Sequence, residues 1–360
     1  MRARLEDVCE RGSSNLRQAD VAGRSGDYPI YGASGYIGNV DFYHQELPYV
    51  AIVKDGAGIG RTALLPAKSS VIGTMQYLLP KKNVLPEYLC YVVRYMHLEK
   101  YFSGATIPHI YFRDYKSEEF NLVPVDYQEE IVATLGKIEA IVAARQRQLQ
   151  KLDELVKARF IELFGGIHNS NKYPYKPIQE LTDVISGGTP NRDVNEYWEC
   201  GTIPWVKTTD LQNNLIKEVD EYITEKGLNS SSAKLVPPGT VLIAMYGQGK
   251  TRGMTAYLNI EACTNQACAC ILPSDQINQT FLWKFLILSY DNLRGMAKGG
   301  NQPNLNGTII KNYPILYPPI ELQEQFAAFV EQTDKSKAVI QKALDEAQLL
   351  FDSLMQKYFG

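Results

Sequence analysis

This chain of 360 residues consists of two copies of one sequence unit, and the repeat restricts the folds it can adopt. LVPVDYQEEIVATLGKIEAI (122–141) aligns with LYPPIELQEQFAAFVEQTDKSK near 316–337, and the offset is 195 residues from Pro124 with Pro319 to Gly165 with Gly360. Upstream, DGAGIGR (55–61) aligns with YGQGKTR (246–252) at an offset of 191, and LEDV (5–8) with LTDV (181–184) at 176. Changing offsets predict loop insertions in a globular part, and the constant offset predicts a closing segment of fixed length.

The closing segment has the pattern of a long helix with a coiled-coil seam, because apolar residues recur at alternating spacings of four and three. A proline followed by an acidic residue precedes each copy, as at a helix start. A helix of ~40 residues is ~60 Å long and cannot bury such a seam alone, so we expect the two copies to pack on each other. The seam positions are Ile131, Leu135, Ile138, Val142, Arg145, Leu149, Leu152, Val156, Arg159 and Leu163 in the first copy, and Phe326, Val330, Thr333, Lys337, Ile340, Leu344, Ala347, Phe351, Leu354 and Tyr358 in the second.

Polar residues interrupt this seam in both copies. They are Arg145 and Arg159 in the first, and Thr333 and Lys337 in the second. Two interpretations stay open: these residues fix pairing and register, or they lie at frayed or partner-facing turns.

The segments between the seams read as mixed and mainly β. YVAIV, GTVLIAM and ACACILP are short apolar runs bounded by Gly, Pro or polar residues, as buried strands are. Residues 85–102 and 278–297 carry helix-like apolar patterns. The sequence therefore predicts an α+β chain with globular domains at 1–125 and 166–320, each followed by a long helix, at 126–165 and 321–360.

Composition limits the classes of partner. The formal net charge is −3, which argues against a simple basic nucleic-acid binder. The globular parts carry 27 Lys and Arg against 26 Asp and Glu, whereas the helical segments carry 10 against 14. Any DNA contact would then need local basic clusters or charge from partner subunits. No apolar run reaches the ~18 residues of a membrane span, and no secretory signal opens the chain, so we expect a cytoplasmic protein without membrane contact.

VLIAMYGQGKTRG (241–253) looks like a nucleotide-binding P-loop when read alone. The pattern wants a glycine five residues before Gly249, where this chain has Ala244. The aligned copy, VAIVKDGAGIGRTA, keeps the glycines and the arginine but has no Lys-Thr. Nucleotide hydrolysis is therefore disfavoured. The turn either needs glycine for positive φ or brings the backbone close to nucleic acid.

Other motifs give little support for catalysis or metal binding. H-E-x-x-H, G-x-S-x-G and the adenine-methyltransferase tetrapeptide are absent. The six cysteines include no C-x-x-C pair and read as reduced structural residues. Two polar loops instead have side chains suited to base edges, SGATIPHIYFRDY (103–115) and its counterpart AKGGNQPNLNGTIIKNY (297–313). A plain loop that caps the long helix is an equally open interpretation for any single residue.

In order and duplication, these stretches resemble the DNA specificity subunit of type I restriction–modification systems. The matching stretches are SGGTPNRDVNEYW, GTIPWVKTTDL, GNQPNLN and PPIELQEQFAAFVEQTD, with SGATIPHIYFRDY and PVDYQEEIVATLGKIEAI in the first copy. The resemblance implies two target recognition domains, each reading half of a bipartite double-stranded DNA target, and two helices that pair antiparallel as a spacer. A helix of ~60 Å corresponds to ~17 base pairs.

The resemblance also implies the partners. Two methylation subunits would dock on the helices and supply S-adenosylmethionine chemistry, and restriction subunits would supply ATP- and Mg-dependent translocation. This chain would bind no cofactor and would not be an enzyme. The first copy has YPIYGASGYIGNVDFY where the second has the GGTP…PWV stretch, so the two domains are expected to belong to different recognition subtypes.

Candidate DNA-binding residues follow from loop position and side-chain chemistry. The alternative function is a coiled-coil adaptor whose globular domains bind protein. The candidates are Lys54, Arg61, His109, Tyr111 and Arg113 in the first domain, and Lys207, Thr208, Tyr246, Lys250, Arg252, Asn301, Gln302 and Asn304 in the second.

Overall fold

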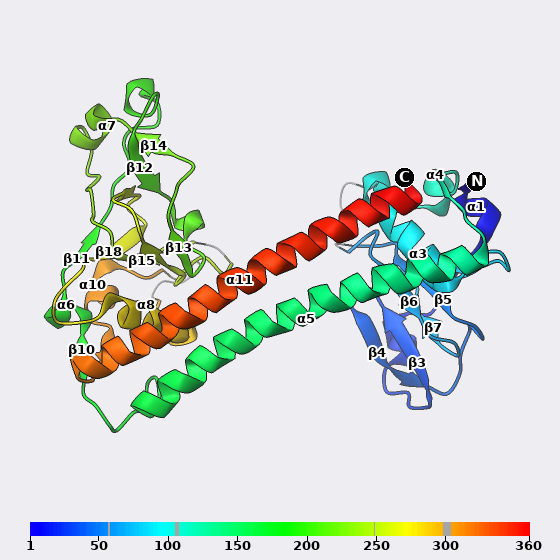
Figure 1. The fold of residues 1–360 in the computed structure, drawn as a ribbon, viewed down its shortest axis with the longest axis horizontal. Coiled ribbons are helices and arrows are strands. Elements are labelled where there is room, and N and C mark those ends of the chain that lie inside the picture. The colour runs from blue at the N-terminus through cyan, green and yellow to red at the C-terminus, as the bar shows by residue number, and fades with distance from the viewer. Residues whose placement is uncertain (57, 105–107, 248, 298–303) are drawn as a thin grey trace. The chain divides into compact units, whose positions relative to one another are not determined.

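The computed structural model describes residues 1–56, 58–104, 108–247, 249–297 and 304–360. They form a mixed α and β protein with two compact units (Figure 1), as the repeat predicts. Unit 1 comprises residues 1–147 and 340–360, and unit 2 comprises residues 148–339. The division falls within both long helices, α5 (Val125–Phe164) and α11 (Ile320–Phe359), whereas the predicted domains end where the helices begin.

Unit 1 is built on a four-stranded sheet of order β2-β8-β5-β6, in which all neighbours are antiparallel. A three-stranded sheet of order β4-β3-β7 has β7 parallel to β3, and β1 pairs with β9. The strands are β1 (Arg2–Arg4), β2 (Cys9–Ser13), β3 (Tyr28–Gly32), β4 (Gly35–Val40), β5 (Tyr49–Val53), β6 (Thr62–Leu65), β7 (Ser70–Val71), β8 (Met75–Pro80) and β9 (Glu119–Asn121). The shorter helices are α1 (Leu5–Val8), α2 (Gln18–Val21), α3 (Pro86–Tyr95) and α4 (Phe112–Tyr115).

Unit 2 has a five-stranded sheet of order β11-β18-β15-β16-β13 and a three-stranded sheet of order β14-β12-β17. In the smaller sheet β17 is parallel to β12, and β10 pairs with β19. The strands are β10 (Tyr175–Pro177), β11 (Val184–Ser186), β12 (Ile203–Val206), β13 (Asn214–Ile216), β14 (Tyr222–Ile223), β15 (Val241–Ala244), β16 (Thr255–Leu258), β17 (Cys263–Thr264), β18 (Cys268–Ile271) and β19 (Pro314–Leu316). The shorter helices are α6 (Ile178–Leu181), α7 (Glu225–Asn229), α8 (Gln279–Leu288), α9 (Tyr290–Gly295) and α10 (Gly307–Lys311).

The two units share one topology. Strands β2, β8, β5 and β6 correspond to β11, β18, β15 and β16, and the parallel pair β3–β7 corresponds to β12–β17. Unit 2 adds β13 and links β12 to β14 through residues 207–221, where unit 1 joins β3 to β4 by residues 33–34. The stretches that look unrelated in sequence thus form equivalent strands with different connections.

The predicted alignment of LEDV with LTDV is wrong by three residues. In α1, Leu5 and Val8 are buried; in α6, the buried residues are Ile178 and Leu181, at an offset of 173. Both short helices follow a strand that pairs with the last strand of the unit. Their first and fourth residues face the core because these positions share one side of a helix. The letters of LTDV match LEDV by coincidence.

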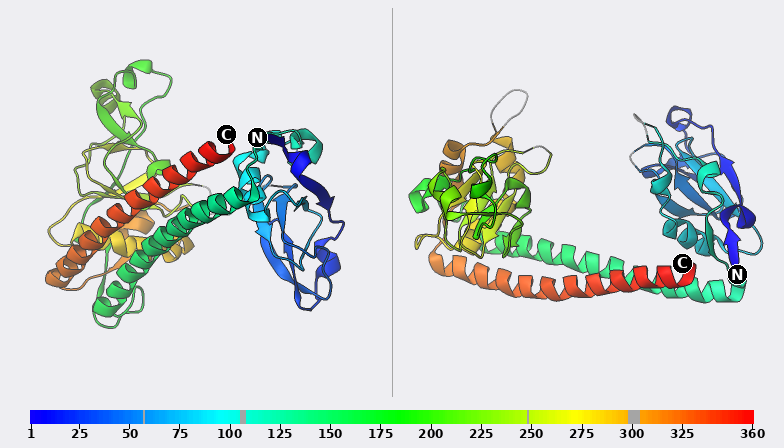
Figure 2. Two further views of the ribbon diagram at one scale, coloured as in Figure 1. Left: turned by 45° about the vertical axis from the view of Figure 1, so that its right-hand side comes forward. Right: turned by 90° about the horizontal axis from the view of Figure 1, so that it is seen from above.

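Within each unit, part of α5 packs beside part of α11 (Figure 2). In unit 1 the early residues Ile131 and Leu135 share an apolar core with the late residue Phe359. In unit 2 the late residue Phe160 lies 5.4 Å, ring to ring, from the early residue Phe326. The start of one helix therefore meets the end of the other, which is the antiparallel pairing that was predicted.

The predicted seam register holds at the start of each helix and then drifts by one residue. Ile131 and Leu135 are buried as predicted, but near the end of α5 the buried residue is Phe160 and not Arg159. In α11, Met355 is likewise more buried than Leu354. A helix of 3.6 residues per turn drifts ~20° per heptad from a strict seven-residue repeat, so four heptads move the buried stripe by nearly one residue.

One polar interruption of the seam joins the two helices within unit 2. Lys337 of α11 lies 2.5 Å from Asp153 of α5, and Thr333 turns its hydroxyl to the carbonyl of Phe329 in its own helix at 2.9 Å. The Lys337–Asp153 ion pair supports the interpretation that this interruption helps to fix the register.

A buried glutamine ties each long helix to its globular part. Gln128 accepts a hydrogen bond from the N–H of Leu85, just before α3, at 2.9 Å and donates to the carbonyl of Asn83 at 3.0 Å. Gln323, at the offset of 195, accepts from the N–H of Asn278, just before α8, at 2.9 Å. Both glutamines are at least 99% buried. Their amides satisfy backbone groups that would otherwise be buried without partners.

Candidate nucleic-acid interface

In unit 1, one backbone hydrogen bond holds a distant loop against the residue that follows β5, and a second joins that residue to the segment just before β8. The N–H of Ile110 donates to the carbonyl of Lys54 at 3.0 Å, and the N–H of Lys54 donates to the carbonyl of Thr74 at 3.0 Å. Ile110 is fully buried, so its side chain anchors the loop. The loop residues on either side of Ile110 are thereby fixed beside the turn that follows β5.

Unit 2 repeats this arrangement bond for bond. The N–H of Leu305 donates to the carbonyl of Met245 at 3.0 Å, and the N–H of Met245 donates to the carbonyl of Ala267 at 2.8 Å. Leu305 and Ile110 are related by the offset of 195, and Met245 and Lys54 by the offset of 191. The repeat found in the sequence therefore places His109 and Asn304 at equivalent positions.

The candidate residues of unit 1 form a polar and aromatic cluster at this edge. The Nδ1 of His109 is hydrogen-bonded to the carboxylate of Asp55, and the imidazole packs on the ring of Tyr111 at 4.1 Å between centroids. The guanidinium of Arg113 lies 4.6 Å from the centroid of the Tyr111 ring. The Nε of Arg113 lies 3.4 Å from the carboxylate of Asp114, and the Arg113 side chain is still 75% exposed, which leaves it accessible to a phosphate or a base.

Arg61, a predicted DNA contact, has a structural role in the turn between β5 and β6. Its Nη2 donates to the carbonyl of Ala33 at 2.9 Å, which joins this turn to the turn between β3 and β4. Gly56, near the start of the same turn, has φ +88°, which only glycine adopts without strain. The requirement for positive φ therefore accounts for this glycine.

The turn of unit 2 that resembles a P-loop is a hairpin connection. It joins β15 to its antiparallel neighbour β16, whereas a phosphate-binding loop leads into a helix. The carbonyl of Lys250 accepts a hydrogen bond from Tyr290 at 2.6 Å, and the carbonyl of Arg252 accepts one from Arg294 at 2.8 Å. Arg294 also donates to the carbonyl of Gly249 at 2.9 Å. Carbonyl oxygens of this turn are thus bound by a cationic side chain, the opposite of amides that cradle phosphate.

Two of the three side chains of this turn that were predicted to contact DNA are exposed. Tyr246 is 42% exposed, and Lys250 is exposed. Arg252 and Asn304 are half-buried, and Asn304 precedes the buried anchor Leu305. Asn301 and Gln302 lie outside the described residues.

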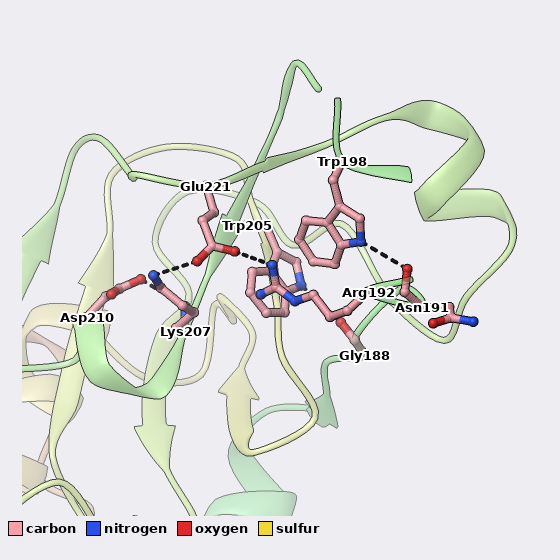
Figure 3. Close-up of polar contacts among 8 residues, drawn as sticks. All are labelled: Gly188, Asn191, Arg192, Trp198, Trp205, Lys207, Asp210 and Glu221. Atoms are coloured by element: carbon pink, nitrogen blue, oxygen red, sulfur yellow. Dashed lines mark hydrogen bonds and ion pairs between the residues drawn. The ribbon is translucent and has the colours of Figure 1, made fainter. Parts of the chain in front are cut away.

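Lys207 lies in a charged network at the carboxyl end of β12 (Figure 3). Its Nζ lies 2.7 Å from Glu221, whose second carboxylate oxygen lies 2.7 Å from Arg192. Burial opposes the ionisation of Glu221, but hydrogen bonds from Lys207 and Arg192 outweigh it and lower the pKa of this carboxyl. The hydrogen bond to Glu221 raises the pKa of Lys207. Lys207 is therefore cationic but already paired.

Arg192 lies against two indole rings in the same network, which meet edge to face at 5.1 Å between centroids. Its guanidinium lies 3.7 Å from the centroid of a Trp198 ring and 4.6 Å from that of Trp205. The indole N–H of Trp205 donates to the carbonyl of Gly188 at 3.0 Å (Figure 3). This network ties the GGTP loop to β12. Thr208, half-buried, begins a short 3-10 turn beyond Lys207.

The structure thus gathers the described candidates at strand ends. In unit 1 they surround the carboxyl end of β5, and in unit 2 they follow β15 and β12. The structure does not test whether any of them contacts DNA, so their assignment stays a prediction. Sequence reasoning missed three residues that hold them, Asp55, Glu221 and Arg294. Of the three, only Asp55 could have been noticed in the sequence, because it is an acidic residue aligned with Tyr246 in the repeated turn.

Within the described part of the chain, no group of three or more His, Cys, Asp or Glu side chains is placed to hold a metal ion, and all six cysteines are free thiols. Among the same residues, no helix is both long and apolar enough to cross a membrane.

Comparison with known families gives a match over most of the chain. The family model described as "Type I restriction modification DNA specificity domain" matches residues 1–154 and 171–348. The two matched stretches correspond to the two copies of the repeat.

Two curated relatives show the same likeness. The chain is 25% identical over 210 residues to the type I restriction enzyme EcoR124I/EcoR124II specificity subunit of Escherichia coli, covering 58% of this chain and 52% of that protein. It is 30% identical over 165 residues to the MjaIX specificity subunit of Methanocaldococcus jannaschii, covering 44% of this chain and 37% of that one. The matched stretch therefore spans about half or less of each of these relatives.

Solved structures support the fold. The crystal structure of a type I restriction–modification S subunit from M. genitalium superposes with a TM-score of 0.62 at 15% identity, covering 100% of this chain and 96% of that one. A second structure, described as showing complex assembly and conformational transition of the type I R-M system, gives 0.56 at 17% identity and covers 99% and 97% of the two chains.

Proposed function

Because the chain belongs to the family of type I restriction–modification DNA specificity domains, we propose that it is the sequence-specific DNA-binding subunit of such a complex. Each unit reads one half of a bipartite target in double-stranded DNA. The two units have different side chains at equivalent positions, so the two half-sites differ in sequence.

One observation carries the proposal beyond family membership. In both units an equivalent backbone hydrogen bond fixes a polar loop at the carboxyl end of a buried strand, from Ile110 to Lys54 in one and from Leu305 to Met245 in the other. The side chains beside these anchors differ, with His109 in unit 1 and Asn304 in unit 2. A constant scaffold with variable side chains is suited to reading different base edges.

The long helices set the spacing between the half-sites and provide the docking surface for partner subunits. Their constant length supports this role, because α5 and α11 each have 40 residues while the globular parts differ in length. We expect two methylation subunits and, where the system cleaves DNA, restriction subunits. The structure whose description names complex assembly of a type I system concerns a protein with this fold.

The chain itself is non-catalytic in this proposal. S-adenosylmethionine, ATP and Mg are bound by the partner subunits, and this chain recognises the DNA sequence. It acts in the cytoplasm, where the DNA lies. A coiled-coil adaptor for proteins is not favoured, since the family match covers both globular parts.

The test uses the chain in complex with the methylation subunits of its own host. We expect the complex to protect one bipartite sequence and to methylate adenines in both halves. Mapping methylated adenines in host DNA, with and without the gene for this chain, identifies that sequence. Specific binding should weaken steeply as salt rises, because counterions are released on phosphate contact. A complex that protects no bipartite sequence, and whose binding is insensitive to salt, would overturn the proposal.

A further inference from the structure

The pair Asp55–His109 presents a problem that the proposed function leaves open. Asp55 is an acidic residue within the cluster that would face DNA phosphates, where negative charge is unfavourable. Its carboxylate is hydrogen-bonded to Nδ1 of His109, and the side chains are 30% and 26% exposed, respectively. A carboxylate at such a surface is therefore expected to have a role other than phosphate binding.

The hydrogen bond determines which ring nitrogen carries the proton. An ionised carboxylate can only accept, so Nδ1 of His109 is the donor. In the neutral imidazole the other nitrogen, Nε2, then carries a lone pair and can only accept. Asp55 thus selects the tautomer that His109 offers on its opposite side.

The ring is also held in place. The N–H of Gly56 donates to the carbonyl of Pro108 at 2.9 Å, and the N–H of Ile110 donates to the carbonyl of Lys54 at 3.0 Å, so the backbones of both residues are fixed on either side. The ring of Tyr111 packs against the imidazole at 4.1 Å between centroids. A functional side chain held by packing and a supporting hydrogen bond is preorganised for recognition.

We propose that Asp55 is a specificity-determining positioning residue of unit 1, which makes His109 a hydrogen-bond acceptor toward DNA. In the major groove an acceptor on the protein matches the exocyclic amine of adenine (N6) or cytosine (N4), and it opposes the acceptors of guanine and thymine. Unit 1 therefore selects adenine or cytosine at one position of one strand of its half-site. This inference rests on the proposed function as a DNA reader.

Unit 2 provides an internal comparison. The residue at the position of Asp55 is Tyr246, and the residue at the position of His109 is Asn304. An asparagine amide both donates and accepts, and no carboxylate stands at the equivalent position to bias it. Loss of a carboxylate should therefore alter base selection in one half-site only.

The experiment selects sequences from a randomised double-stranded DNA library with the full chain in its complex with the methylation subunits. The variants are His109→Ala and Asp55→Asn. Asp41→Asn is a matched control, because Asp41 is a 70% exposed carboxylate paired with Arg24 at 3.5 Å, next to the end of β4 that pairs with the start of β3. We expect both test variants to lose about tenfold of discrimination at the same single position. The second half-site and the control should select as the unmodified chain does.

A spectroscopic readout tests the tautomer directly. The chain has four histidines, so selective nitrogen-15 labelling gives few resonances to assign. We expect Nε2 of His109 to be the unprotonated nitrogen, and Asp55→Asn to mix the two tautomers. An unprotonated Nδ1 in the unmodified chain would overturn the inference whatever the folding behaviour of the variants.

The possible outcomes separate the inference from the proposed function. If the unmodified complex enriches no bipartite sequence, the proposed function itself fails. If it enriches one, but both variants select the same bases as before, the inference fails and the function stands. If only His109→Ala relaxes the position, or if Asp41→Asn relaxes it equally, Asp55 has no positioning role.

Discussion

At the scale of single residues, the motif GQGKT suggests two ligands for Lys250, a DNA phosphate or a nucleotide phosphate, and substitution of Lys250 distinguishes them. We expect Lys250→Ala to weaken binding to all DNA sequences about equally and to reduce the salt slope by about one, because a lysine that contacts phosphate carries no base information. The unmodified chain should bind no nucleotide, since the turn is a hairpin whose carbonyls face Arg294. DNA titrations at several salt concentrations, with calorimetry for ATP, measure both.

Lys217 offers the matched control for that substitution. It is exposed and directly follows β13. Because β13 runs parallel to β16 and β15 runs antiparallel to β16, the carboxyl end of β13 and the turn after β15 lie at opposite ends of the strands. Lys217→Ala should leave the salt slope unchanged. An unchanged slope for Lys250→Ala as well would contradict the phosphate contact.

The cysteines give a second residue-scale prediction. Cys200 is exposed, whereas burial raises the pKa of the Cys9 thiol to about 12 and that of Cys263 to about 11. Because only the thiolate reacts, we expect one fast equivalent per folded chain with a thiol reagent at pH 8 and five more on unfolding. Cys200→Ser should abolish the fast phase and Cys263→Ser should leave it. Two fast equivalents in the unmodified chain would contradict the packing around a buried thiol.

At the scale of elements, the buried glutamine of each long helix predicts a stability effect. Gln128→Met keeps the volume but leaves the N–H of Leu85 without its partner, so we expect a loss of about 1–3 kcal/mol in the free energy of unfolding of unit 1. Urea unfolding measures the loss, and hydrogen exchange should show faster exchange in the first turn of α3.

An exposed glutamine on the same helix is the control for this substitution. Gln146 is exposed on the surface of α5 and belongs to unit 1, as Gln128 does. Gln146→Met should change the free energy of unfolding of unit 1 by no more than about 0.5 kcal/mol. Equal effects of the two substitutions would show that the backbone bonds of Gln128 contribute little.

Elements with a strong local pattern could be predicted from the sequence. The run YVAIV forms β5, buried at all five positions, and the fixed offset of 195 led to two helices of equal length. Short strands could not be predicted, because β7 and β17 have two residues each and exist only through parallel pairing with distant strands. The strict heptad pattern also failed near the helix ends, where Phe160 and Met355 are buried in place of the predicted Arg159 and Leu354.

The candidate site could likewise be predicted from the sequence only in part. The repeat offsets related Lys54 to Met245, and the backbone bonds of the two residues are equivalent. The partners of the site side chains could not be predicted, because Glu221 and Arg294 reach Lys207 and the turn at Lys250 from other segments without any fixed spacing. Contacts of this kind depend on tertiary packing, which leaves no local pattern.

At the scale of the whole molecule, the net charge of −3 limits what the chain can do alone. Some of its cations already lie beside carboxylates, as Lys207 does beside Glu221 and the exposed Arg113 does beside Asp114. Affinity for DNA arises largely from phosphate neutralisation. On the proposed function, a chain with this balance should bind weakly by itself and gain affinity in the complex, where methylation subunits would add phosphate contacts.

The long helices lead to the last prediction, which concerns the spacing of the target. Both cross the boundary between the units, α5 after Arg147 and α11 before Ile340. Inserting seven residues at both points keeps the heptad phase and adds ~10.5 Å of helix, or ~3 base pairs. We expect the half-sites to stay the same and the spacer between them to lengthen by about three base pairs, as read from methylated adenines in host DNA. Inserting two residues at each point rotates the apolar seam away from the partner helix, so this variant should lose specific binding. An unchanged spacer in the seven-residue variant would mean that the helices do not set the distance between the half-sites.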